Sequence, residues 1–107
     1  MKKLIWCLLF LSGSAFAYDW DVVGKVTRLE PSFVPDHLNI RIDTAAGSCP
    51  AGIWIFYGGN GSTEQDRKDS VKAAYAALLS SLLTGTSVEF YGFNTNCTVG
   101  QMHVLKQ

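Results

Sequence analysis

Residues 53–91 of this chain read IWIFYGGNGSTEQDRKDSVKAAYAALLSSLLTGTSVEFY. The stretch opens on a short apolar run, 53–57, and a glycine-rich turn follows that run. Apolar side chains then recur at helical spacing, and a run over 87–91 alternates like a strand. The recurring apolar residues are Val71, Ala74, Tyr75, Leu78, Leu79 and Leu82. We therefore predict a strand, a helix and a strand, with the apolar stripe of the helix packed on a sheet.

The predicted helix has a signal at each end. Ser62 with Gln65, or Thr63 with Asp66, provides a capping arrangement at its N-terminus. Gly85 stands where a left-handed C-terminal cap is expected.

Three further strand-like runs lie outside this stretch. Residues 20–30 are rich in valine, and Gly24 within them indicates a bend that lets one strand serve two sheets. Residues 38–43 alternate apolar and polar side chains, and residues 102–105 form the last run. Five strands with a helix between the third and the fourth is the order of the oligonucleotide/oligosaccharide-binding (OB) barrel. We expect a mainly β fold, a five-stranded OB-type barrel whose open end the helix covers.

The N-terminus has the pattern of a secretory signal peptide over residues 1–17. Lys2 and Lys3 precede an apolar run, and the tripeptide 15–17, Ala-Phe-Ala, fits a signal-peptidase site. An uncleaved membrane anchor is the alternative, but the apolar run is too short for a spanning helix. We expect cleavage after residue 17, which leaves an OB-like domain over 18–107. That domain would be secreted or periplasmic and would have no membrane span.

The balance of basic and acidic residues argues against some classes of partner. The chain has nine basic and nine acidic residues, and removal of Lys2 and Lys3 leaves seven basic residues against nine acidic ones. A nucleic-acid-binding protein needs a clustered positive surface. We therefore expect no nucleic-acid partner.

The cysteines predict a disulfide. Cys7 lies within the predicted signal peptide, so Cys49 and Cys97 remain. An even pair in an exported chain is typical of a disulfide. Free thiols and metal ligation are the alternatives, and neither cysteine has a neighbouring histidine. In the chain-entropy model, closing a loop of this length stabilises the fold by about 4 kcal/mol, which is comparable to the whole stability of a small domain.

The sequence shows no arrangement typical of catalysis. His37 and His103 have no neighbours that suggest a triad or a metal site, and the motif G-x-S-x-G is absent. Asp66 and Asp69 are explained by the helix dipole. We predict that the chain is not an enzyme and has no catalytic residue, metal or cofactor.

Aromatic side chains are the most informative feature. The chain after residue 17 keeps more of them than a small barrel can hide. Sugars stack their C–H faces on aromatic rings and offer hydroxyls to Asn, Asp or the backbone, so aromatic loops with Asn and Asp fit glycan binding. A subunit interface is an alternative, and core packing accounts for some of the rings. The ligand-binding candidates are Phe33, Asp36, Tyr57, Tyr91 and Asn94.

Residues 69–91 resemble the helix and following strand of the B subunits of AB5-type toxins, in particular the subtilase cytotoxin B subunit and its typhoid-toxin-like relatives. The shared features are a helix with Tyr-x-x-x-Leu, a glycine that ends it, and a strand of the form Val-x-aromatic-Tyr. Residues 23–26, Val-Gly-Lys-Val, are similar to the family's first strand. The resemblance implies an OB fold and a homo-pentamer with helices lining its pore. It also implies binding of cell-surface glycans and delivery of an enzymatic A subunit.

The chain departs from that family at its ligand site. Val23 stands where those B subunits place a serine that holds sialic acid, and Gly92 stands where an aromatic residue follows the strand tyrosine. The cysteine spacing also differs. A stand-alone exported relative with another ligand fits the same residues. The alternative function is a periplasmic OB-fold module that binds a small ligand or a protein, or inhibits one.

Overall fold

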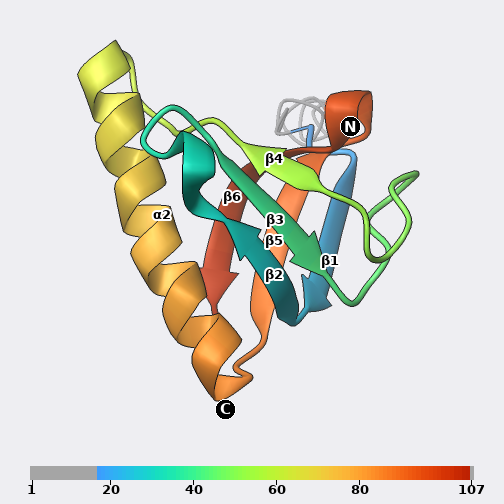
Figure 1. The fold of residues 1–107 in the computed structure, drawn as a ribbon. Helices are drawn as coiled ribbons and strands as arrows, with labels where there is room; N and C mark the ends of the chain where they lie inside the picture. The colour runs from blue at the N-terminus through green and yellow to red at the C-terminus, as the bar shows by residue number, and fades with distance from the viewer. Residues whose placement is uncertain (1–16, 107) are drawn as a thin grey trace, which may run out of the picture.

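The computed structural model describes residues 17–106, so the predicted signal peptide lies outside the described residues except for its last residue. The fold is mainly β: six strands form one curled half-barrel sheet, and one α-helix lies between the fourth and fifth strands of the described chain (Figure 1). The strands are β1 (Trp20–Gly24), β2 (Val26–Glu30), β3 (Leu38–Ile42), β4 (Ile55–Tyr57), β5 (Val88–Phe93) and β6 (Thr98–Val104). The helix is α2 (Glu64–Thr84), and the 3-10 turns are η2 (Pro31–Phe33) and η3 (Thr95–Cys97).

The structure has six strands where the sequence predicts five, because the first run breaks at Lys25. The backbone N–H of Lys25 donates to the Asp43 carboxylate at 2.8 Å and not to a strand partner. A Cβ on buried Gly24 would lie 2.9 Å from Thr44 Oγ1, so glycine lets this corner approach the end of β3. Tertiary contacts at the bend, which a periodicity pattern does not contain, therefore divide one predicted strand into β1 and β2.

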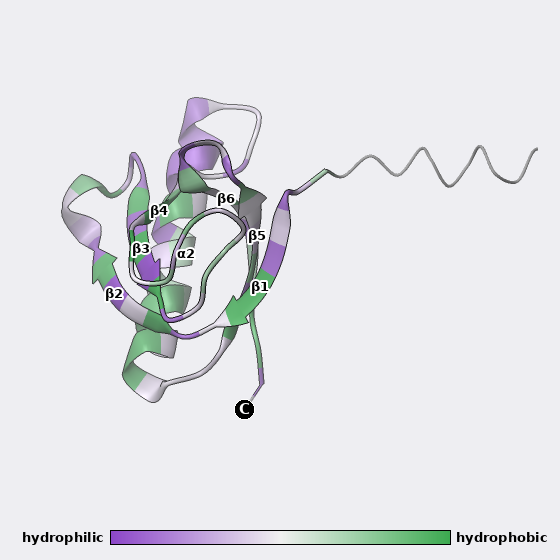
Figure 2. Cartoon of the chain, turned by 90° about the vertical axis from the view of Figure 1, so that its right-hand side faces the viewer, coloured by the Kyte–Doolittle hydropathy of each residue, from purple (hydrophilic) through white to green (hydrophobic). Residues whose placement is uncertain are grey.

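The order of the strands in the sheet explains its curl. The order is β1-β5-β6-β4-β3-β2, so two strands that follow each other in sequence lie at opposite edges. Every pairing is antiparallel except that of β4 with β6. Because a single residue joins β1 to β2, the sheet must curl until its two edges meet there, and Figure 2 looks along this curl with α2 behind it.

The core fills the inside of the curl. Alternate residues of the strands point inward, and one face of α2 covers them from the open side. The buried apolar residues are Trp20, Val26, Leu38, Ile40, Ile42, Ala46, Cys49, Ile55, Tyr57, Val71, Ala74, Leu78, Val88, Phe90 and Val99. The predicted inward positions of the second run, Leu38, Ile40 and Ile42, are confirmed.

Helix α2 begins and ends where the sequence predicts. Of the two capping arrangements left open, Thr63 with Asp66 is the one that forms, with a bond of 3.0 Å from the Asp66 N–H to Thr63 Oγ1. Gly85 is left-handed at φ 75°, and its N–H donates to the Ser81 carbonyl. The predicted stripe is buried at Val71, Ala74 and Leu78, with Tyr75 and Leu82 packed against the same core. Within residues 17–106, no helix has the length and hydropathy needed to cross a membrane.

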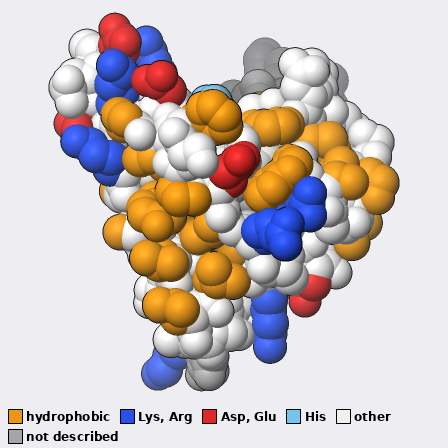
Figure 3. All heavy atoms as spheres, viewed as in Figure 1, with side chains coloured by type: hydrophobic (Ala, Val, Ile, Leu, Met, Phe, Trp, Pro, Cys, Tyr) orange, Lys and Arg blue, Asp and Glu red, His pale blue; other side chains and the backbone are white. Residues whose placement is uncertain are grey.

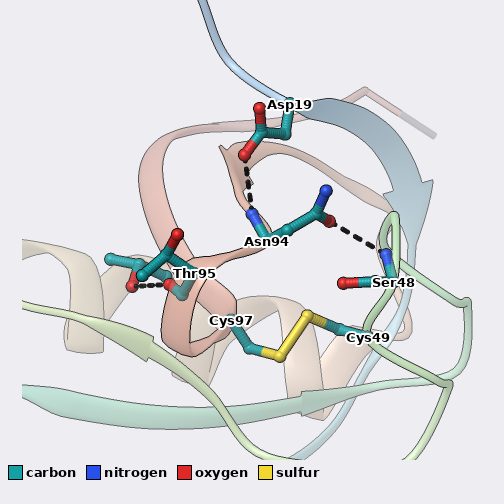
Figure 4. The surroundings of a disulfide bond; sticks show 7 residues. Asp19, Ser48, Cys49, Asn94, Thr95 and Cys97 are labelled. Carbon is teal, nitrogen blue, oxygen red and sulfur yellow. Dashed lines mark hydrogen bonds between the residues drawn. A yellow bond between two sulfur atoms is a disulfide. The ribbon is translucent and has the colours of Figure 1, made fainter.

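The predicted disulfide between Cys49 and Cys97 is confirmed (Figure 4). The two Cα atoms are 6.0 Å apart, within the usual range for a disulfide. Cys49 ends a tight turn in which it exchanges two backbone hydrogen bonds of 2.8 Å with Ala46. Since Cys97 lies in η3, the bond joins the loop before β4 to the loop between β5 and β6.

Candidate functional site

An open surface of aromatic and polar side chains lies on the outer face of β1, β5 and β6. We name it the β5 surface, and it consists of Tyr18, Asp21, Glu89, Tyr91, Phe93, Gln101 and His103. Alternation along β5 turns Phe90 into the core and Glu89 and Tyr91 outward. The strand register then places Tyr91 between Asp21 and Gln101. No pocket occurs in the described part of the chain, so this site is an exposed face.

Three rings form the aromatic half of the β5 surface. The Tyr18 ring centroid lies 5.5 Å from that of Tyr91 and 5.2 Å from that of Phe93, both in tilted arrangements. These separations are typical of favourable aromatic pairs. A Cβ on Gly100 would overlap the Tyr18 ring, so glycine at this position makes room for it. Phe93 keeps 37% of its surface exposed, which leaves part of the aromatic half open to a ligand.

Hydrogen bonds link the polar half of the β5 surface to these rings. The Tyr18 hydroxyl donates to Gln101 Oε1 at 3.2 Å, and Gln101 Nε2 lies 2.9 Å from His103 Nε2. His103 Nδ1 is 3.7 Å from Glu89 Oε1, and its ring meets the Tyr91 ring edge-on at 5.4 Å. This connected set fixes the orientation of the amide and the imidazole, and it presents donors and acceptors beside the rings.

Two neighbouring acids give the β5 surface its electrostatic character. The pKa of Asp21 is raised above its ordinary value, first by a side-chain hydrogen bond with Glu89 and then by desolvation and repulsion from that carboxylate. The pKa of the Tyr91 phenol is also raised, mainly by desolvation and then by Glu89. Glu89 thus raises the pKa of both neighbours, and both shifts favour the protonated forms of Asp21 and Tyr91. Among residues 17–106, no three His, Cys, Asp or Glu side chains come together in a way that could hold a metal ion.

Of the five predicted ligand-binding candidates, Tyr91 alone lies in the β5 surface. Phe33 and Asp36 are exposed in the loop between β2 and β3. The Phe33 ring stacks on that of His37, with centroids 4.9 Å apart and an interplanar angle of 11°. The loop candidates thus form a separate aromatic feature beyond β2.

The remaining two candidates, Tyr57 and Asn94, make their contacts within the protein. Tyr57 is 5% exposed, and its hydroxyl lies 2.6 Å from Ser70 Oγ on α2, so its ring belongs to the core. Asn94 Oδ1 accepts a hydrogen bond from the Ser48 N–H, and the Asn94 N–H donates to the Asp19 carboxylate, each at 2.9 Å (Figure 4). The side-chain oxygen of Asn94 is therefore already engaged within the chain.

Sequence reasoning did not identify most of the β5 surface. The alternating run over 87–91 placed Glu89 and Tyr91 on one face, which was the usable signal. The other polar residues of this face are Asp21 on β1 and Gln101 and His103 on β6. Asp21 in particular is distant from β5 in sequence. Their proximity depends on strand register, and a single sequence does not specify it.

Comparison of the chain with protein-family models, with curated proteins and with solved structures finds no match in any of the three.

Proposed function

We propose that this chain is an exported glycan-binding domain that holds its ligand on the β5 surface. The observation that carries the proposal is the open group of Tyr18, Tyr91 and Phe93 rings beside carboxylate, amide and imidazole groups. Sugar C–H faces pack on such rings, and sugar hydroxyls pair with such polar groups. A small number of placed polar groups beside apolar surface is the usual composition of a ligand site.

The strand order supports an OB-type barrel. When β1 and β2 are counted as one bent strand, five strands remain, and α2 lies between the third and the fourth. This count and helix position are those of the OB fold, which often binds oligosaccharides. Fold analogy supports a binding role in general, and the residues of the β5 surface favour a glycan as the ligand.

The finer proposal is the B subunit of an AB5-like toxin, or a stand-alone relative of one. Such a subunit would form a homo-pentamer, bind a cell-surface glycan and carry an enzymatic A subunit. Support comes from the resemblance over residues 69–91 and from the absence of charged residues between Lys72 and Glu89. Figure 3 shows hydrophobic side chains over the second half of α2 and charged ones over its first turns. Uncharged helix surface of this kind suits contact between subunits.

A second candidate is a periplasmic module that binds a small ligand or a protein, or inhibits one. The exposed Phe33 ring, stacked on His37 in the loop between β2 and β3, favours it. In OB domains this loop is one of the ligand-contacting loops. Recovery of a protein partner that is lost with Phe33→Ala would support this candidate over glycan binding.

Glycan binding can be tested with aromatic variants. The exported chain would be screened on a glycan array, and calorimetry would measure the affinity for any glycan that binds. We expect Tyr91→Ala to weaken binding at least about tenfold, because the variant loses the ring on which the sugar would pack. Tyr91→Phe, which keeps the ring, should retain most of the affinity. Phe33→Ala removes an exposed ring far from Tyr91 and serves as the matched control.

Two outcomes would contradict the proposal. One is the absence of binding to any glycan by a folded, disulfide-bonded sample. The other is an equal loss of affinity in Tyr91→Ala and Phe33→Ala, which would show that the β5 surface is not the site. Circular dichroism of each variant checks that it is folded.

A further inference from the structure

A second surface lies on the outer face of β2, β3 and β4. We name it the arginine face, and it consists of Arg28, Glu30, Asn39, Arg41, Trp54 and Phe56. The register sets Glu30, Asn39 and Phe56 side by side in one row across the strands, and Arg28 faces Arg41 in the next row. Trp54 precedes β4 and lies beside Arg41. Figure 3 shows basic side chains gathered near the middle of this face, with hydrophobic side chains around them.

Two arginines face each other on adjacent strands, and neither has a counter-ion among the described residues. Arg28 pairs with Arg41 in the register of β2 and β3, and like charges directly opposite each other destabilise a sheet. Within residues 17–106, the ion pairs closer than 4.0 Å involve Lys68, Lys72 and His103, and no carboxylate lies that close to either arginine. The two arginines thus occupy facing positions on adjacent strands, and no carboxylate of residues 17–106 pairs with either of them.

The nearby carboxylates are committed to other groups. Glu30 Oε1 accepts a hydrogen bond of 2.7 Å from Asn39 Nδ2. Asp43 Oδ1 accepts from the Lys25 N–H at 2.8 Å and from the Thr44 hydroxyl at 3.0 Å. These bonds orient both carboxylates, and among residues 17–106 neither carboxylate forms an ion pair with Arg28 or Arg41 within 4.0 Å.

The Arg41 side chain is held in place while part of its hydrogen-bonding capacity is unused. Its guanidinium carbon lies 4.3 Å from the centre of the Trp54 ring, a cation–π contact that fixes the planar group. Within the part of the chain that the structure describes, the Arg41 Nε–H has no acceptor. On the same face, Asn39 is 93% buried, since 7% of its surface is exposed, and its Oδ1 has no donor. Buried polar groups in proteins are normally paired, so this face is incomplete as it stands.

We propose that the arginine face binds an oxyanion, a carboxylate, sulfate or phosphate group, between Arg28 and Arg41. Guanidinium groups pair with such anions through two parallel hydrogen bonds, and one anion would relieve the repulsion between both arginines. The Trp54 and Phe56 rings would adjoin the part of the ligand that carries the anion, and Phe56 is 38% exposed. This site lies on different strands from the β5 surface, so it stands whether or not that surface binds glycans.

The arginine side chains allow a direct test by NMR. The chain has three arginines, Arg28, Arg41 and Arg67, and therefore three Nε–H signals. The exported chain would be titrated with sodium sulfate, phosphate or glucuronate at constant ionic strength, with chloride as the reference. We expect saturable shifts of the Arg28 and Arg41 signals and of the Trp54 indole N–H. Arg67, whose Nη1 donates to the Gly61 carbonyl, should not shift. The order of affinity among the three anions identifies the group that the site prefers.

Charge-matched variants separate a site from a general charge effect. Arg28→Gln, Arg41→Gln and Arg67→Gln each remove one positive charge. We expect Arg41→Gln and Arg28→Gln to weaken anion binding at least about tenfold and Arg67→Gln to change it less than about twofold. If Arg41→Gln does not fold, exposed Arg28→Gln carries the test. The proposal is overturned if no anion shifts these signals more than chloride does, or if Arg67→Gln weakens binding as much as the other two.

Discussion

At the scale of single residues, Asn94 shows how one polar side chain joins distant segments. It connects the turn at Ser48 to the chain before β1 at Asp19, beside the disulfide. The turn itself depends on Gly47, which is left-handed at φ 57° and where a Cβ would overlap both Asn94 Oδ1 and the Trp20 ring. These contacts give Asn94 a structural role that requires no ligand.

The acid pair on the β5 surface predicts a pH-dependent change in stability. Because the folded pKa of Asp21 is raised, ionising this carboxyl disfavours the folded state. That cost is fully present above the folded pKa and disappears as the pH falls below the unfolded value. We expect Asp21→Asn to raise the melting temperature slightly at pH 7 and to lose this advantage near pH 3. Asp36→Asn removes the same charge in the loop between β2 and β3. An equal gain in that control would show a net-charge effect and contradict the prediction.

Phe90 tests the core at the same scale. Its ring is completely buried in the core, so truncation leaves a cavity. We expect Phe90→Ala to lower the free energy of unfolding by about 3–5 kcal/mol, a large part of the stability of a small domain. Phe33→Ala, at a ring that is 49% exposed, should change it by less than about 0.5 kcal/mol. Urea unfolding of both variants gives the comparison, and similar midpoints would be incompatible with the core described above.

At the scale of elements, local signals were sufficient for α2 and insufficient for the strands and surfaces. Both ends of the helix are predictable because Thr63 and Gly85 cap it through hydrogen bonds to residues close to them in sequence. The break between β1 and β2 depends on Asp43, which follows the end of β3 and is 18 residues from Lys25 in sequence. Tyr57 is a ligand-binding candidate in the sequence because it is aromatic, and alternation alone does not say which face of the apolar run 53–57 points into the core. The β5 surface and the arginine face both arise from register between strands distant in sequence.

The disulfide is the element-scale feature with the largest expected effect on stability. It joins two loops that are 48 residues apart in sequence. Cross-linking a loop of this length restricts the unfolded chain, and in the chain-entropy model it stabilises the fold by about 4 kcal/mol. We therefore expect reduction, or the double variant Cys49→Ser with Cys97→Ser, to shift the urea midpoint strongly downward. An unchanged midpoint after complete reduction, verified by thiol alkylation and mass spectrometry, would contradict this expectation.

At the scale of the whole molecule, the curl of the sheet separates two outward surfaces. The β5 surface occupies the β1 side of the strand order, and the arginine face occupies the β2 side. The first carries paired acids and open rings, whereas the second carries paired arginines beside a tryptophan. The two proposed sites therefore do not overlap, and neither of them includes a residue of α2.

That half of α2 makes the proposed homo-pentamer testable. Leu83 is 77% exposed, and the helix carries no charge after Lys72, so a subunit interface would bury this apolar surface. We expect light scattering to give about five times the mass of one chain, and Leu83→Glu to reduce it to that of a monomer. Lys72→Glu places the same negative charge earlier on the helix and should disturb assembly less. A monomer for the unmodified chain at micromolar concentration would remove the pentamer and leave a stand-alone binding domain.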